Sequence, residues 1–295
     1  MLNHDKSFLN IEDSINGLKE DGVAVIKNQI NKNELNLINE KVRNILKYPS
    51  ILGNVGFSMK DPFKKTYDAF LLDKIVPNVI SNKNILKIIK NYLRDEIVIS
   101  EVFLKHDFGD NLTYFPYHRH TGHNGQNKLF GCGLILYLHD TEEGAFCYSI
   151  GSHKENLDDE PEKLYFSKNK DRFFKNLRRI NAKMGDILIF DESGFHGPEQ
   201  PTQKYRSVII SGYRSKKIFN NQTKTEIPFL NTSFKLLDEE QKSALGLNND
   251  ASGVYSDYHL RNKTNIKNIL YLYKIIQIQF FLQKIIIKIK KLIKK

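Results

Sequence analysis

The sequence predicts a mainly β domain, an antiparallel sandwich or barrel with helices ahead of it. Residues 97–213 carry six short segments rich in β-branched and aromatic residues, punctuated by Gly, Asn, Asp and Pro. The preceding residues show helical rather than alternating apolar spacing. With 295 residues, 40% of them hydrophobic and 27% charged, the chain can bury a core, which excludes a disordered or low-complexity protein.

The first elements are a strand followed by helices. The stretch DGVAVIK at 21–27 is a short β-branched run. Residues 31–46 place Leu35, Ile38 and Val42 at helical spacing, which predicts a helix. The apolar stripe within residues 84–93 predicts a second helix.

The six β-rich segments predict the sheet itself, and they cover residues 97–104, 111–117, 129–138, 145–150, 185–190 and 206–213. Residues 153–179 are rich in Lys, Asp and Asn. We expect this insert to be a loop with a short helix over one mouth of the sheet. The predicted domain spans residues 1–260, and residues 261–295 form a separate basic tail.

Most of the net charge of +11 belongs to that tail. Residues 261–295 contain ten Lys or Arg and no Asp or Glu, so the first 260 residues carry a net charge of only +1. A nearly neutral body argues against a nucleic-acid partner, which requires clustered cations. Two cysteines, Cys132 and Cys147, are too few for a disulfide scaffold, and no secretion signal opens the chain. We therefore expect a cytoplasmic protein.

The tail predicts a C-terminal amphipathic helix. Ile275, Leu282 and Ile289 lie on one apolar stripe, and lysines gather on another face. The lysines and glutamines interrupt the segment too often for a span of about 20 apolar residues. Such a helix binds an anionic membrane surface peripherally, or docks its apolar stripe on the domain or on a second subunit. Membrane contact would favour a lipid or lipid-linked saccharide as substrate.

Histidines and one arginine are the candidate site residues. His118 and His120 stand two residues apart after a predicted strand, so both side chains can face one cavity and bind one metal ion. His196 follows an apolar strand, and Arg206 opens the next. If these strands are neighbours, a third imidazole and a guanidinium suited to a carboxylate enter the same cavity.

Four stretches of the chain carry a family resemblance, and they are LKEDGVAVIKNQINKNELNLINEKV, PYHRHTG around His118, LILYLHDTEEGAFCYSIGSHK at 134–154 and GDILIFDESGFHGPEQPTQKYRSVIISGY at 185–213. These stretches resemble the phytanoyl-CoA dioxygenase-like branch of the iron(II) and 2-oxoglutarate-dependent oxygenases. Together they cover roughly residues 18–215 in the family's order. The resemblance implies a double-stranded β-helix (jelly-roll, cupin-like) core and hydroxylation of a small molecule with dioxygen.

The resemblance also implies roles for individual residues. His118 and His196 would be iron ligands, and Arg206 would bind the far carboxylate of 2-oxoglutarate. Lys105 stands where family members often carry a lysine that contacts this cosubstrate, although a solvated lysine at a strand end is an equal alternative. His153, in GSHK, resembles a structural turn residue rather than a ligand.

His120 departs from the family pattern, which usually reads His, any residue, Asp. If His120 binds iron, three neutral imidazoles replace two imidazoles and an anion. Alternatively, His120 turns away and water or an anion takes its place, or the site is degenerate and inactive. Asp191 and Glu192 offer a replacement carboxylate, but we expect them to be a turn residue and a surface charge at a strand end.

Two further functions remain open from the sequence. One is a non-catalytic, membrane-associated binding protein that keeps the fold without turnover. The other is a three-histidine metal oxygenase that does not use 2-oxoglutarate.

Overall fold

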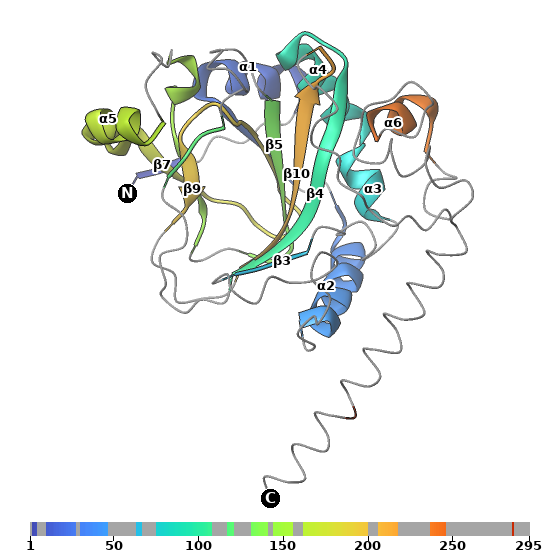
Figure 1. Cartoon of the computed structure of the whole chain (residues 1–295). Helices are drawn as coiled ribbons and strands as arrows, with labels where there is room; N and C mark the ends of the chain where they lie inside the picture. Colours follow the sequence, from blue (N-terminus) through green and yellow to red (C-terminus); the bar gives the residue numbers. More distant parts are fainter. Residues whose placement is uncertain are drawn as a thin grey trace, which may run out of the picture.

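Figure 1 shows the computed structural model of the chain, whose core is two β-sheets. The structure describes residues 2–4, 10–27, 30–46, 63–66, 75–107, 117–120, 131–140, 144–155, 162–199, 206–217, 237–245 and 285. One sheet contains β2 (Val23–Ile26), β3 (Phe63–Thr66), β4 (Ile97–Asp107), β5 (Gly131–Tyr137), β8 (Ile187–Asp191) and β10 (Arg206–Ser215), in the order β2-β8-β5-β10-β4-β3. The other contains β1 (Leu2–His4), β6 (Phe146–Ser149), β7 (Leu177–Ile180) and β9 (His196–Pro198), in the order β1-β7-β6-β9.

Among the strands that the structure describes, every pair except β1 with β7 is antiparallel, as predicted. The helices lie around the sheets (Figure 1) and are α1 (Ile11–Asp21), α2 (Lys32–Leu46), α3 (Ile75–Ile80), α4 (Lys83–Leu93), α5 (Glu162–Asn176) and α6 (Glu239–Ala244), with a 3-10 turn at Ser152–Lys154. The predicted helices at 31–46 and 84–93 are confirmed as α2 and α4. The mainly β architecture with flanking helices is therefore confirmed.

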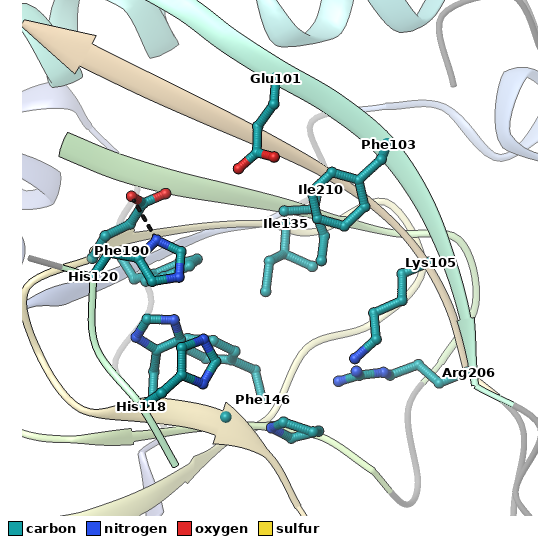
Figure 2. A pocket seen from close by; sticks show the side chains of 14 residues that line it. Glu101, Phe103, Lys105, His118, His120, Ile135, Phe146, Phe190, Arg206 and Ile210 are labelled. Carbon is teal, nitrogen blue, oxygen red and sulfur yellow. Dashed lines mark hydrogen bonds and ion pairs between the residues drawn. The ribbon is translucent and has the colours of Figure 1, made fainter. Parts of the chain in front are cut away.

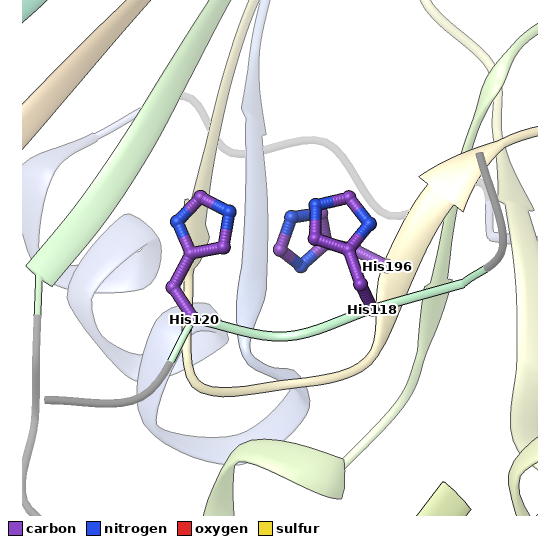
Figure 3. Close-up of side chains that lie close together, drawn as sticks. All are labelled: His118, His120 and His196. Carbon is purple, nitrogen blue, oxygen red and sulfur yellow. The ribbon is translucent and has the colours of Figure 1, made fainter. Parts of the chain in front are cut away.

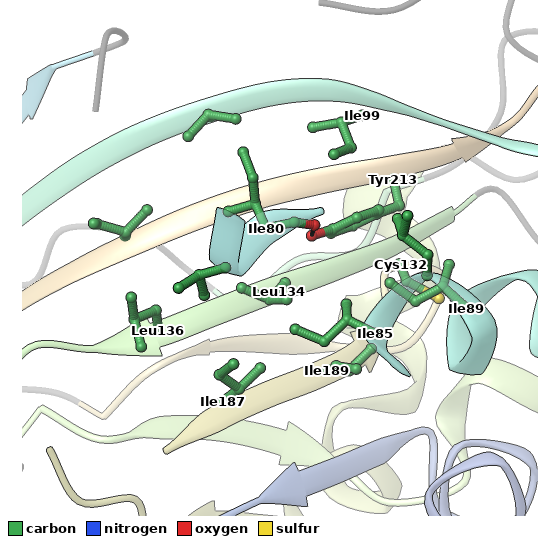
Figure 4. Close-up of a cluster of buried hydrophobic side chains, with 14 of the residues drawn as sticks. Ile80, Ile85, Ile89, Ile99, Cys132, Leu134, Leu136, Ile187, Ile189 and Tyr213 are labelled. Carbon is green, nitrogen blue, oxygen red and sulfur yellow. Dashed lines mark hydrogen bonds between the residues drawn. The ribbon is translucent and has the colours of Figure 1, made fainter. Parts of the chain in front are cut away.

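The central strands are buried on both faces, which explains their continuous apolar runs. On β5, Leu134 and Leu136 pack with Ile85 and Ile89 of the helical layer (Figure 4). The intervening Ile135 belongs to a second apolar cluster, which also contains side chains of the smaller sheet. Alternate residues thus face the helices and the space between the sheets.

A β-bulge determines which residues of β4 face that space. The register of β4 against β10 shifts by one residue between Gly212 and Tyr213. Along β4, the odd-numbered residues before the shift, such as Ile97, pack with the helical layer. After the shift, the even-numbered residues, such as Leu104, pack with it instead. A bulge reverses the facing of all residues that follow it. Odd-numbered residues in the range 101–105 are therefore turned into the space between the sheets.

The insert at 153–179 differs from its prediction. It contains the 15-residue helix α5 rather than a short helix, and it ends in strand β7. Helix α5 offers weak apolar periodicity because most of its residues are polar, and its C-terminal half buries Phe173 while Phe174 is exposed. Strand β7 was not predicted because its sequence, LRRI, is too short to show a clear apolar and polar pattern.

Two predictions fall largely outside the described residues. Of the strand expected at 111–117, only Tyr117 is described, and it belongs to no strand. Of the tail, only Ile285 is described, so the amphipathic helix stays a prediction. None of the helices that the structure describes has both the length and the apolar character needed to span a membrane.

A buried hydrogen bond ties the helical layer to the loop after β8. The Tyr92 hydroxyl donates to Asp191 Oδ2 at 2.6 Å, and Asp191 is fully buried. We expect Tyr92→Phe to lower the free energy of unfolding by about 1–3 kcal/mol, because it removes a donor from a buried carboxylate. Urea unfolding measures this difference, and an unchanged m-value shows that the lower midpoint reflects lower stability. A variant as stable as the parent would contradict the importance of this bond.

Candidate metal centre

A cavity of about 330 Å³ lies between the two sheets (Figure 2). Its wall combines three imidazoles, two cationic side chains, two carboxylates and apolar side chains. The lining residues are Glu101, Phe103, Lys105, His118, His120, Ile135, Phe146, Phe190, Glu192, His196, Gly197, Pro198, Arg206 and Ile210. All five site residues predicted from the sequence therefore lie in one cavity.

Backbone pairing brings the two histidine segments together. His118 and His196 form an antiparallel bridge, with N···O distances of 3.0 and 2.8 Å between their backbones. Two residues on, the His120 amide donates to the carbonyl oxygen of Glu192 at 2.7 Å. The segment around His118 therefore runs beside the β8–β9 loop, although 78 positions separate His118 from His196 in the sequence.

The three imidazoles converge on one region of the cavity (Figure 3). Their ring centroids are 4.6 Å apart for His118 and His196, 5.3 Å for His118 and His120, and 5.4 Å for His120 and His196. One nitrogen from each ring lies within 4.8 Å of the other two. His120 has therefore not turned away from its two neighbours, and the three rings can act as ligands of a single metal ion.

Hydrogen bonds select the tautomers of two of these rings. His196 Nδ1 lies 2.8 Å from the carbonyl oxygen of Gly194, and His120 Nδ1 lies 3.1 Å from Glu192 Oε2. A carbonyl or an ionised carboxylate can only accept, so each Nδ1 carries the proton. The lone pair then resides on Nε2. Partners of this kind orient histidine ligands in metal sites.

Electrostatics also keep His196 neutral. Burial lowers the pKa of His196 well below its usual value, and the neighbouring His118 and His120 lower it further. A neutral imidazole is the form that binds a metal ion.

Glu192 is a buried charge rather than the expected surface charge. Its side chain is only 3% exposed, and its Oε2 lies 2.7 Å from Arg214 Nη2 as well as 3.1 Å from His120 Nδ1. Burial raises the pKa of Glu192, but Arg214 and then His120 outweigh this and bring the pKa to about 2. The prediction of an exposed residue is wrong because Glu192 continues the pairing of β8 with β5 by one residue, its amide donating to the Gly131 carbonyl, so its side chain faces the cavity as that of Phe190 does.

Asp191 has a structural role, as predicted. Besides the bond from Tyr92, it accepts from the Ser193 amide at 2.7 Å and from the Ser193 hydroxyl. Its carboxylate is turned toward the helical layer and lies outside the three-histidine cluster.

Lys105 and Arg206 form the cationic end of the cavity, opposite the histidines (Figure 2). Both are buried, at 8% and 4% exposed. The Arg206 Nη1 donates to the Gly144 carbonyl at 2.6 Å, which fixes the guanidinium. The alternative of a solvated lysine at a strand end is therefore wrong for Lys105, because the β4 bulge turns it inward.

Sequence reasoning missed Glu101 and the apolar wall. Glu101 and Phe103 face the cavity only because of the bulge, which has no clear signal in the sequence. Phe190 leans into the cavity over Gly133, where an added Cβ would lie 2.2 Å from the Phe190 ring. His153, which we did not expect to be a ligand, instead lies with its Nε2 3.2 Å from the Lys19 carbonyl oxygen.

Comparison with protein families decides the assignment. The family model described as phytanoyl-CoA dioxygenase (PhyH) matches residues 18–208, well over half of the chain. The chain belongs to this family. This membership confirms the resemblance found in the sequence. The protein is therefore an oxygenase that depends on iron and 2-oxoglutarate. Among curated proteins, no sequence matches the chain.

Solved structures show the same fold. EctD from S. alaskensis with bound Fe matches with a TM-score of 0.59 and 15% identity, over 73% of this chain and 80% of EctD. HygX from Streptomyces hygroscopicus, with nickel and 2-oxoglutarate bound, gives a TM-score of 0.53 and 17% identity over 76% and 93%. The epimerase SnoN from nogalamycin biosynthesis gives 0.52 and 14% over 70% and 83%. These likenesses confirm the double-stranded β-helix core.

Proposed function

We propose that this oxygenase holds its iron with His118, His120 and His196 and hydroxylates a small molecule. The convergence of three imidazole nitrogens within 4.8 Å of one another is the observation that supports this most directly. The donor set fits the metal, because imidazole suits iron and two of the rings already have Nε2 available. When bound, iron with dioxygen and 2-oxoglutarate supplies the oxidation of a substrate C–H bond.

Lys105 and Arg206 are proposed to bind the far carboxylate of 2-oxoglutarate. A planar guanidinium held in place by Gly144 suits bidentate recognition of a carboxylate, and Lys105 adds a second positive charge on the same wall. The histidines and these cations lie on opposite sides of the cavity (Figure 2), as a cosubstrate with two carboxylate ends requires. Their contribution is to orient the cosubstrate.

The rest of the wall is suited to hold the substrate and exclude water. Ile135, Phe146, Phe190 and Ile210 are apolar, whereas Glu101 offers a carboxylate that can accept hydrogen bonds. Substrate and dioxygen are the partners we propose for this space. A lipid-linked substrate and peripheral membrane contact through residues 261–295 depend on the tail and stay predictions.

Iron-dependent conversion of 2-oxoglutarate to succinate tests the proposal. Purified protein with Fe(II), 2-oxoglutarate, ascorbate and air should form succinate slowly even without the substrate that it hydroxylates, and none after the iron is chelated. Retention of iron without succinate formation would favour the three-histidine oxygenase that does not use 2-oxoglutarate. Failure to retain iron would favour the non-catalytic binding protein.

A further inference from the structure

We propose that Glu192 is a positioning residue for His120 and that it offsets the missing carboxylate ligand of the His-x-Asp pattern. The inference rests on the proposed function, because it assigns His120 as a metal ligand. Arg214, Glu192 and His120 form a row of side-chain contacts, in which one buried carboxylate oxygen of Glu192 contacts both the guanidinium and an imidazole nitrogen.

The contacts of Glu192 fix the orientation of His120. The carboxylate accepts from His120 Nδ1, and the neighbouring backbone carbonyl of Glu192 accepts from the His120 amide at 2.7 Å. The ring and the backbone of His120 are thus held by the same residue. With Nδ1 protonated, Nε2 is the nitrogen left to bind the metal.

The same contact makes His120 a stronger ligand. A carboxylate that accepts from the far side of an imidazole raises the basicity of the coordinating nitrogen. Arg214 contacts the same carboxylate oxygen and offsets part of its negative charge. Glu192 therefore compensates only in part for the missing carboxylate ligand.

The surroundings favour this arrangement over a chance contact. Arg214 is 9% exposed and Glu192 3%, so neither side chain is an ordinary surface charge. Glycine stands at position 131 beside them, where an added Cβ would lie 2.7 Å from Arg214 Nη1 and 2.2 Å from the Tyr213 carbonyl oxygen. The fold therefore leaves room for the guanidinium at the place from which it reaches Glu192.

A double-mutant cycle on metal affinity tests the proposal. Co(II) is titrated into metal-free protein without 2-oxoglutarate, and binding is followed by the visible d–d spectrum. Glu192→Gln should weaken Co(II) binding roughly 10- to 100-fold in the parent chain, as expected for the partner of a metal ligand. In a His120→Asp background, which restores the family's carboxylate, the same change should alter affinity by less than about threefold, since Glu192 then has no imidazole to orient.

A second variant tests the same proposal if the Glu192→Gln variant does not fold. If Glu192→Gln alone is unstable because Arg214 loses its partner, Glu192→Gln with Arg214→Met removes both charges and should show the same affinity loss. Equal losses in the parent and His120→Asp backgrounds would overturn the proposal, because they would show a general structural role. An unchanged affinity in the parent would overturn it as well. If the parent binds no Co(II) at all, the proposed function fails rather than this inference alone.

Discussion

Replacing His196 with alanine is expected to weaken Fe(II) binding by more than about 100-fold and to abolish succinate formation. Loss of an outer partner of a metal ligand typically costs about 10- to 100-fold in affinity, and loss of the ligand itself should cost more. His196 is the most buried of the three imidazoles and the only one supplied by the smaller sheet. Its removal leaves His118 and His120, which are too few to hold the ion firmly.

His153→Ala is the matched control for this prediction. It also removes a histidine, but this ring contacts the Lys19 carbonyl in α1 and does not line the cavity. Iron content after desalting, measured by mass spectrometry on both variants, compares them directly. Equal iron content in the His196→Ala variant and the parent would show that the metal binds elsewhere.

Replacing Arg206 with alanine should raise the dissociation constant of 2-oxoglutarate while leaving iron affinity nearly unchanged. Removing one member of a buried, hydrogen-bonded charge pair costs about 2–5 kcal/mol, or roughly 30- to 5,000-fold in affinity. Arg206→Lys should recover part of this loss, because lysine keeps the charge without the bidentate fork. Calorimetric titration of 2-oxoglutarate into the anaerobic iron-loaded protein measures both variants.

Arg179→Ala is the control for Arg206. The Arg179 guanidinium pairs with Glu199 at 3.0 Å and does not line the cavity, so its loss should leave 2-oxoglutarate binding intact. If the Arg206→Ala variant binds 2-oxoglutarate as tightly as the parent, the cationic end of the cavity has another ligand. The three-histidine oxygenase without 2-oxoglutarate would then gain support.

The five candidate residues predicted from the sequence line one cavity, and most of them lie at or beside strand ends. His118 and His120 share a face by simple alternation, and His196 and Arg206 follow or open apolar strands. Those strands are not neighbours as we supposed from the sequence, because β5 separates β8 from β10 and His196 opens β9 of the smaller sheet. The two sheets enclose the cavity between them, and this brings His196 and Arg206 to its wall. The fold class followed from the same short strands.

The features that sequence reasoning missed depend on a bulge, on contacts between residues distant in sequence, or on a helix with weak apolar periodicity. Lys105 and Glu101 face the cavity because of one extra residue in β4, a bulge that no local pattern announces. Glu192 looked like a surface charge because its two partners, His120 and Arg214, are distant in sequence and meet it only after folding. Helix α5 was underestimated because its residues are mostly polar.

The most direct test of the account is the visible spectrum of the anaerobic protein with Fe(II) and 2-oxoglutarate. We propose that His118, His120 and His196 hold iron in one cavity, opposite Lys105 and Arg206. We therefore expect a charge-transfer band that appears when both iron and 2-oxoglutarate are present and is absent in the His196→Ala variant. A parent protein that retains no iron, or that binds iron and 2-oxoglutarate without producing this band, would contradict it.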